Sequence, residues 1–242
     1  MRNDLWQARV DFAAVFRWSA RLGYQTGTCN HYSLMVPGSD DRFLVNPEGL
    51  FWSEITASSL LLCDLDGKVI EGEGKLERTA YCLHAPIHRM NPKARALLHT
   101  HMPYATALCL LDGGRLEPTN QTAVVFWDRI AYDENYLGLA MEPEEGVRVG
   151  NILGDKDIVM MRNHGPMVSG PSIAQAFGNL YFLEEACKVQ LIAMSANRPM
   201  KPIQPKIAES VVKEVQTWPE YADTYLVAIK RTLDREEPDY AS

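Results

Sequence analysis

The spacing of hydrophobic and polar positions changes several times along the chain. From Leu5 to Leu22, apolar residues recur at helical intervals among arginines, and Gly23 ends the pattern. Helical spacing returns from Glu77 to Arg89, and Ser172 is a natural N-cap for a long helix that runs to about Ala196. Further helices are predicted for Tyr104–Leu111, Ala208–Val215 and Tyr221–Leu233.

Short apolar segments between turn signals predict strands. They are most frequent in the first third of the chain, where Asp64–Gly67 has the sequence of a hairpin turn and Gly67 can accept a positive φ. Strands joined by hairpins and followed by alternating helices predict an α/β fold with a mixed, largely antiparallel sheet. The predicted strands are Tyr32–Val36, Phe43–Val45, Leu60–Leu62, Lys68–Ile70, Ala94–His99 and Ile158–Met161.

Composition and charge narrow the class of protein. A chain of 242 residues with 46% hydrophobic and 23% charged residues is typical of a folded domain and does not require a second core. The net charge of −7 provides no basic surface for nucleic acid or anionic lipid, so neither is expected as a partner. The first residues lack an apolar run, and no stretch approaches the ~20 apolar residues of a membrane span, so we expect a soluble, cytoplasmic protein.

Other common sites lack support in the sequence. The five cysteines are scattered without a C-x-x-C pair, which indicates reduced thiols rather than a disulfide or zinc-ribbon framework. Neither the G-x-G-x-x-G pattern of dinucleotide-binding folds nor a P-loop is present. The candidate chemistry therefore lies with the six histidines.

Two histidines directly follow an apolar segment. On a strand, His99 and His101 would project to the same face, because residues two apart do so. A third, His164, follows the strand predicted at Ile158–Met161 and precedes Gly165, where we expect the chain to turn. Three neutral imidazoles at ~2.1 Å from an ion, with an open fourth position, are the arrangement of a catalytic metal. The alternative is that these are hydrogen-bonded strand-end and turn residues.

Glu77 is the carboxylate that we place beside the histidines. It stands at the predicted start of a helix that leads directly to the His99 strand, where it could serve as a metal ligand or as a general acid/base. The alternative is a helix N-terminal glutamate that interacts only with the helix dipole. On composition alone, Glu71 and Glu73 compete for the same role.

Four blocks of sequence together resemble one known family. They occur in the same order over about residues 5 to 200, and they resemble the class II aldolase/adducin family, with a tail similar to its bacterial adducin-like branch. The blocks are Gly27-Thr-Cys-Asn-His-Tyr-Ser33, Glu77 to His101 with its continuation to Ala107, Arg162-Asn-His-Gly165 and Leu183-Glu-Glu-Ala-Cys-Lys-Val-Gln190.

The resemblance implies a three-layer α/β/α sandwich with a divalent metal held by His99, His101 and His164, and with Glu77 at the acid/base position. It implies a class II aldolase/adducin-type domain over residues 1–200 and a helical tail, 201–242, packed on the same domain or on a neighbouring subunit. Members are typically cyclic homotetramers whose sites lie at subunit boundaries, so a neighbouring chain is expected to complete the pocket.

The chain departs from the sugar-phosphate aldolases of that family at the residues that bind phosphate. Those enzymes use a Gly-Asn-x-Ser loop, a Thr-Gly turn and a Ser-Ser pair before the catalytic glutamate. Here His31 replaces the Asn, Glu48-Gly49 replaces Thr-Gly and Lys75-Leu76 replaces Ser-Ser. An acidic Glu48 would repel a phosphate, so we expect a non-phosphorylated substrate. The residues that we assign to the substrate pocket are Asn30, His31, Gly49 and Lys75.

The spacing also differs from that family branch. The interval from Glu77 to His99 is three residues longer, so an ungapped match would put Ala80 at the acid/base position. His84 and His88, four apart on one helix face, could bind metal but are expected to be packed or hydrogen-bonded. Other candidates for the pocket are Tyr104, Gln121, Tyr132 and Tyr136.

The sequence leaves several functions open. The first is a metal-dependent carbon–carbon lyase that acts through a metal-stabilised enediolate or enolate on a hydroxy-carbonyl or hydroxy-carboxylate, as an aldolase or a decarboxylase. An epimerase would use the same chemistry, and a non-catalytic adducin-like interaction module would predict decay of the metal ligands. Imidazole ligands with an oxygen ligand suit Zn²⁺, which we favour, and also Mn²⁺.

Overall fold

The computed structural model describes residues 2–218 and 220–242, and its centre is a mixed β-sheet. Within those residues the strand order is β4-β3-β2-β1-β5-β8-β7-β6, and neighbouring strands are antiparallel except for the parallel pair β6 and β7. The strands are β1 (His31–Met35), β2 (Arg42–Val45), β3 (Leu61–Asp64), β4 (Val69–Glu71), β5 (Ala96–His99), β6 (Ile130–Asp133), β7 (Ile158–Met161) and β8 (Gly165–Gly170).

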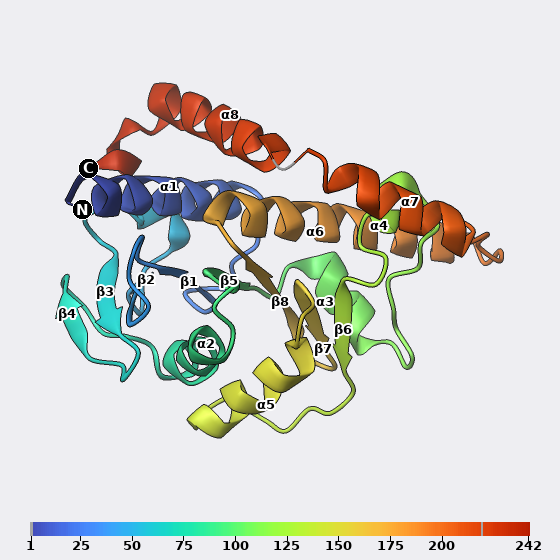
Figure 1. The fold of residues 1–242 in the computed structure, drawn as a ribbon, viewed down its shortest axis with the longest axis horizontal. Coiled ribbons are helices and arrows are strands. Elements are labelled where there is room, and N and C mark those ends of the chain that lie inside the picture. Colours follow the sequence, from blue (N-terminus) through green and yellow to red (C-terminus); the bar gives the residue numbers. More distant parts are fainter. Residues whose placement is uncertain (1, 219) are drawn as a thin grey trace.

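Helices cover both faces of the sheet. In Figure 1, α1, α6 and α8 form a layer above it, while α2 and α5 lie side by side below it. This is the three-layer α/β/α sandwich expected from the sequence. The helices are α1 (Arg2–Arg21), α2 (Arg78–Met90), α3 (Pro103–Leu110), α4 (Gln121–Val124), α5 (Pro143–Leu153), α6 (Ile173–Ser195), α7 (Pro205–Val215) and α8 (Glu220–Glu236), with 3-10 turns at Trp52–Glu54 and Pro238–Ala241.

Alternation along the strands sorts side chains between the two layers. On β5, Ala96 and Leu98 join the core beneath α1 and α6, whereas Leu97 joins the core formed with α2 and α5. His99 is two residues beyond Leu97 and therefore points to the α2 side. The neighbouring strand β1 follows the same rule, with Tyr32 and Leu34 in the upper core. The odd-numbered residues of both strands thus face α2.

Most predicted elements are present, with ends shifted by up to three residues. The chain turns at residues 162–164, close to the expected position, but the strand β8 that follows from Gly165 was not predicted. Its glycines and Pro166 obscured the strand in the sequence, while pairing with both β5 and β7 stabilises it in the fold. The elements β6, α4 and α5 were also not predicted.

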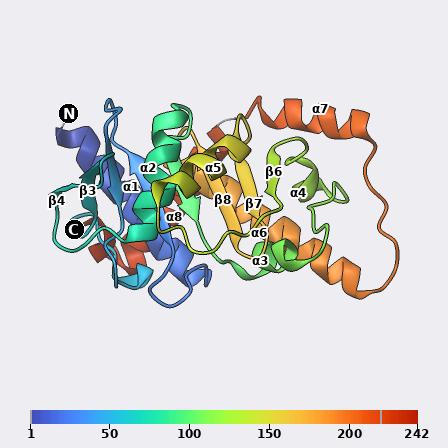
Figure 2. The same ribbon diagram turned by 90° about the horizontal axis from the view of Figure 1, so that it is seen from below.

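Helix α8 lies on the upper layer of this chain. Helix α8 packs against α1 and α6, and Lys230 Nζ donates to Asp11 Oδ1 over 2.5 Å. Figure 2 shows the far part of α6 projecting beyond the sheet, and α7, which contacts α4, lying apart from it on the opposite edge of the molecule. In the part of the chain described here, every helix is too short or too polar to cross a lipid bilayer.

Candidate metal centre

His99 is the last residue of β5 and its ring is fixed by the neighbouring strand. The side chain is buried, and its Nδ1 lies 3.0 Å from the carbonyl oxygen of Pro166 on β8. A carbonyl can only accept, so Nδ1 carries the proton and Nε2 keeps its lone pair. Metal-binding histidines are commonly oriented in this way by a second partner.

His101 lies in the short loop between β5 and α3, not on the strand with His99 as the spacing had suggested. The loop is tightened where the Thr100 hydroxyl accepts the Met102 amide over 3.1 Å. Directly after it, the buried carboxylate of Glu184 on α6 accepts the amides of Tyr104 and Ala105 at 2.9 and 2.8 Å. Glu184 therefore caps α3 from another helix and fixes the position of the His101 loop.

His164 reaches the same point from the turn between β7 and β8. Asn163 adopts a left-handed φ of 56°, which an asparagine tolerates, and this reverses the chain. A Cβ on Gly165 would lie 2.7 Å from the backbone oxygen of Thr100, so only glycine allows this close approach. The glycine is what lets the turn pack directly against the His101 loop.

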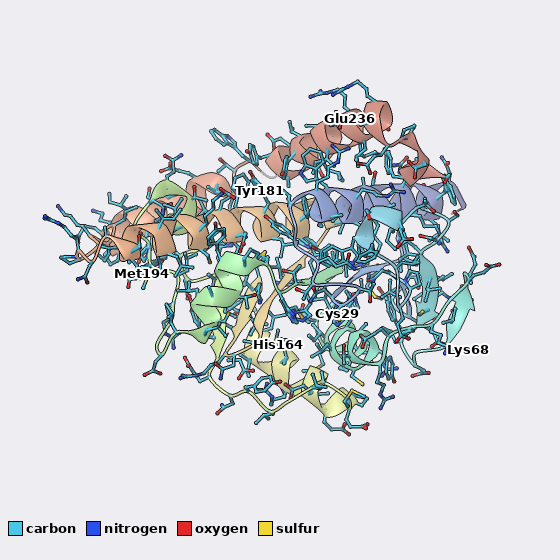
Figure 3. The ribbon with its side chains drawn as sticks, turned by 180° about the vertical axis from the view of Figure 1, so that it is seen from behind. Cys29, Lys68, His164, Tyr181, Met194 and Glu236 are labelled. Atoms are coloured by element: carbon cyan, nitrogen blue, oxygen red, sulfur yellow. The ribbon has the colours of Figure 1, made fainter. Side chains whose placement is uncertain are left out.

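The three imidazoles surround one point. Their ring centroids are 5.1 Å (His99 and His101), 4.7 Å (His99 and His164) and 5.0 Å (His101 and His164) apart, and one ligand atom from each lies within 4.8 Å of the others. His101 Nε2 is buried and, among the described residues, has no hydrogen-bond partner. Figure 3 shows His164 in the middle of the molecule. A divalent cation would satisfy the orphaned nitrogen, so the residues fit a metal.

The electrostatics favour the neutral form that metal binding requires. Burial lowers the pKa of His99, and the neighbouring imidazoles lower it further. Burial and His101 lower the pKa of His164 to about 4, although Glu145 and Asp133 act in the opposite direction. Burial also lowers the pKa of His101. All three rings are therefore uncharged at neutral pH, with a lone pair available to a ligand.

Glu77 lies at the edge of this cluster as the N-cap of α2. Its Oε2 accepts the Ala80 amide over 2.8 Å and the Thr79 hydroxyl over 2.6 Å. Burial tends to raise the pKa of the carboxyl, but these hydrogen bonds and the nearby His31 outweigh it and the net pKa is lowered. The sequence offered both a capping and a catalytic interpretation, and the capping contact is present.

His31 lies between Glu77 and the three histidines. It is paired across the sheet with His99, at a ring-centroid distance of 5.1 Å, and its Nε2 is 3.7 Å from Glu77 Oε2. The backbone before it is set by Asn30, which has a φ of 76° and whose side chain accepts the Thr26 amide over 2.9 Å. Asn30 is thus engaged with its own loop, while His31 faces the cluster.

The other assigned pocket residues are less directly placed. Gly49 has a positive φ of 89° in the loop after β2. That loop is tied to the segment before α2 where the Glu48 amide donates to the Lys75 carbonyl over 2.9 Å. Contacts among the described residues bring neither Gly49 nor Lys75 against the three histidines.

The structure distinguishes the other residues that the sequence offered as candidates for the site. Glu71 is on edge strand β4 and pairs with Arg9 at 2.9 Å, so it is not available at the histidines. Tyr132 lies under Arg115, at 4.2 Å from the guanidinium to the ring centroid, and its hydroxyl accepts the Leu116 amide. Tyr136 is half exposed, with its ring 6.3 Å from that of His164.

Two contributors escaped the sequence analysis. Thr79 holds the Glu77 carboxylate, and a threonine in the first turn of a helix gives no signal of such a role. Glu184 had no predicted role of its own, although a carboxylate among apolar residues of a long helix can indicate a buried partner.

Comparison with known proteins identifies the family. Residues 10–191 match the family described as Class II Aldolase and Adducin N-terminal domain, and the chain belongs to it. It is 34% identical over 247 residues to a putative aldolase class 2 protein of Caulobacter vibrioides, covering 98% of this chain and 92% of that protein.

Solved structures agree with that assignment. An aldolase II superfamily protein from Pseudomonas syringae superposes with a TM-score of 0.91 at 33% identity, covering 99% of this chain and 96% of that one. L-fuculose 1-phosphate aldolase from Glaciozyma antarctica PI12 gives a TM-score of 0.86 at 26% identity, covering 98% and 92%. The chain is therefore similar over nearly its whole length to aldolase-type proteins.

Proposed function

We propose that this protein is a divalent-metal-dependent carbon–carbon lyase, of aldolase or decarboxylase type, acting on a non-phosphorylated hydroxy-carbonyl or hydroxy-carboxylate substrate. The observation that carries the proposal is the convergence of three neutral imidazoles from two separate segments around the orphaned Nε2 of His101. Similarity to an L-fuculose 1-phosphate aldolase supports the reaction class.

His99, His101 and His164 would hold the ion, with Zn²⁺ favoured and Mn²⁺ as the alternative. When bound, the cation would act as a Lewis acid that polarises a substrate carbonyl and stabilises the negative charge that bond cleavage leaves behind. The His99 Nδ1 proton, held by Pro166, keeps Nε2 as the coordinating nitrogen. Glu184 keeps His101 in place through the first turn of α3.

Glu77 is the group that we assign to proton transfer. Its lowered pKa keeps it ionised at neutral pH, so the carboxylate can accept a proton and return it later. Thr79 and the Ala80 amide orient the carboxylate and stabilise its charge. Because Glu77 is the N-cap of α2, its side chain is held by the first turn of the helix.

The substrate class follows from side chains that differ from the phosphate-binding pattern. Glu48 stands where a phosphate-binding turn would need a neutral hydroxyl, and Leu76 supplies no hydrogen-bond donor. Lys75 could still pair with a substrate carboxylate, and Asn30, His31 and Gly49 would line the same pocket. These differences are the basis for a non-phosphorylated substrate.

We further propose a homotetramer with sites at subunit boundaries, in which a neighbouring chain closes the pocket. An exposed apolar loop after β6, with Leu137, Leu139 and Met141, stands next to Tyr136 near His164 and supports such a contact. The cytoplasmic location expected from the sequence stays a prediction, as do the domain limit at residue 200 and the helical tail 201–242.

The experiment is to measure metal content and product release together. The purified wild type should retain about one ion per chain and release an aldehyde or carbon dioxide from one of a panel of hydroxy acids and hydroxy-carbonyls. His101→Ala should lose both, because a two-imidazole site binds the ion far less tightly. A His101→Ala protein with full metal occupancy would contradict the ligand assignment.

The same measurement separates the alternatives. Less than about half an ion per chain in the wild type would favour a non-catalytic interaction module related to the adducins, which belong to the same family. A full metal site without bond cleavage, but with inversion of a substrate stereocentre, would favour the epimerase.

A further inference from the structure

Behind His31 lies a buried chain of hydrogen bonds between β1 and α2. His31 Nδ1 is 2.8 Å from His84 Nε2, and His84 Nδ1 is 2.5 Å from the Ser33 hydroxyl. The Ser33 hydroxyl is also 2.7 Å from His88 Nε2, and His88 Nδ1 is 2.7 Å from the carbonyl oxygen of Ala94. Strand alternation places His31 and Ser33 on the same face of β1, opposite α2.

The Ala94 end of this hydrogen-bond chain fixes which group donates and which accepts in every hydrogen bond of the chain. The Ala94 carbonyl can only accept, so the proton of neutral His88 is on Nδ1 and its Nε2 is an acceptor. The Ser33 hydroxyl must then donate to His88 and accept from His84 Nδ1. His84 Nε2 is left as an acceptor, so His31 donates to it from Nδ1.

The chain of hydrogen bonds ends in the protein interior, and this limits its chemical role. His84 and His88 are both buried, and burial lowers the pKa of His88 to about 4 and that of His84 well below its usual value. The rings are therefore neutral, and the last acceptor is the backbone carbonyl of the buried Ala94, which cannot take up and pass on a proton. The chain can set tautomers, but it offers no route for proton delivery.

We propose that His84, Ser33 and His88 are positioning residues that lock His31 as the Nδ1–H tautomer, so that its Nε2 lone pair faces Glu77 and accepts a hydrogen bond from a substrate hydroxyl. The inference rests on the proposed function, since it concerns the same site. Free neutral histidine prefers the proton on Nε2, so a lock is needed to hold the other form.

The surroundings of His31 Nε2 define the ligand group that it accepts. The Thr79 hydroxyl is 3.2 Å away, but its one proton goes to Glu77 Oε2, the nearer oxygen at 2.6 Å. His31 Nε2 therefore lies beside two further acceptors, the Thr79 oxygen and the Glu77 carboxylate, and neither of them donates a hydrogen bond to it. A neutral hydroxyl satisfies this arrangement, whereas a carboxylate or phosphate oxygen would be repelled.

The first test reads the tautomers directly in the metal-free protein. Two-bond ¹⁵N–¹H correlation spectra of the histidine rings should show His31, His84 and His88 as single Nδ1–H forms at neutral pH. In Ser33→Ala, His84 loses its acceptor, so His31 and His84 should become mixtures or shift to Nε2–H. His88 should stay Nδ1–H, because Ala94 still holds it.

Ser19→Ala is the matched control. Ser19 is also a fully buried serine, and its hydroxyl accepts the Tyr32 hydroxyl over 3.1 Å on the opposite side of β1. This variant should leave all three tautomers unchanged. Wild-type His31 in the Nε2–H form would overturn the proposal even if Ser33→Ala failed to fold, and so would an unchanged His31 tautomer in a folded Ser33→Ala protein.

A second test addresses the ligand group. Calorimetric binding of glycolate, which has a hydroxyl, and of oxalate, which has none, should be compared in the zinc-loaded wild type and Ser33→Ala. Loss of one neutral hydrogen bond should weaken glycolate about five-fold and leave oxalate unchanged. Equal weakening of both ligands, or no change in either, would overturn the hydroxyl assignment. The tautomer spectra need no metal, so they can fail or succeed independently of the proposed lyase.

Discussion

At the residue scale, the site depends on side chains whose protonation and orientation are fixed by hydrogen bonds to neighbouring groups. His99 is fixed through Pro166, and Glu77 receives two hydrogen bonds at the start of α2. Neither arrangement involves an exposed group, so each reacting atom is presented by a rigid surrounding. Preorganisation of this kind lowers the cost of binding and of charge development during reaction.

Glu77→Gln should separate metal binding from proton transfer. The glutamine oxygen can still accept the Ala80 amide, so the helix cap and most of the metal should remain, while turnover falls by about 10²- to 10⁴-fold. Metal content and product release, measured on the same preparation, check this. The matched control is Glu73→Gln in the preceding loop, an exposed position that should keep full turnover. Normal turnover in Glu77→Gln would move the acid/base role to another group.

Stability of the metal-free protein should fall as the pH falls from about 6.5 to about 4. Burial lowers the folded-state pKa of His88 to about 4. Between these two pH values His88 is therefore protonated in the unfolded chain and neutral in the folded chain, which favours unfolding. A difference of this size costs about 3 kcal/mol at the acid end. Urea unfolding at pH 7, 6 and 5 with a chelator checks the slope. His88→Gln should show a shallower slope, and an equal slope in both proteins would contradict this account.

At the scale of elements, the metal site is held where β5, β8 and α3 meet. The strand pair orients His99, the turn before β8 carries His164, and the loop before α3 carries His101. Helix α6 contributes no ligand, yet its Glu184 satisfies two amides at the start of α3. The loop geometry therefore depends on a contact between two helices that are far apart in the sequence.

Glu184→Gln should loosen the His101 loop. A glutamine has one acceptor oxygen where the carboxylate has two, so one buried amide of α3 loses its partner at a cost of about 1–3 kcal/mol. We also expect metal affinity to fall by about 10-fold, since the change acts on a ligand's support. Chelator competition and urea unfolding measure the two effects. Glu185→Gln, half exposed on the same helix, is the control and should change stability by less than about 0.5 kcal/mol.

At the scale of the whole molecule, two features point outward. Helix α6 projects beyond the sheet, with Met194 near its far end (Figure 3). The loop between β6 and α5 exposes Leu137 and Leu139 at 66% and 77%. Such apolar side chains beside a candidate site favour contact with another chain.

Association into a tetramer should depend on that loop. Sedimentation of the wild type should give the mass of four 27.2 kDa chains. Leu139→Asp would place a charge in the contact, which should produce smaller species and lower turnover without loss of metal. A wild-type monomer at micromolar concentration would contradict the tetramer. An unchanged tetramer in Leu139→Asp would place the interface elsewhere.

The sequence by itself determined the architecture and the identity of the candidate ligands. Alternation and helical spacing reflect local geometry, so α1, α2, α6 and the strands of the first third could be predicted from them. The pair His99 and His101 was visible because both follow one apolar segment. The short strands β6 and β8 could not be recognised in the sequence. Half-buried side chains in β6, and glycine and proline in β8, weaken the alternation of apolar and polar residues, and pairing with neighbouring strands stabilises both strands in spite of this.

Only the tertiary structure decided which distant groups meet. No local pattern could show that His164 reaches His101, because this depends on the absence of a side chain at Gly165 packed against Thr100. Likewise, the bonds that join His31 to His84, Ser33 and His88 arise where α2 lies across β1. Proton positions follow from such contacts, since a ring's tautomer is set by its partner in space and not by its neighbours in sequence.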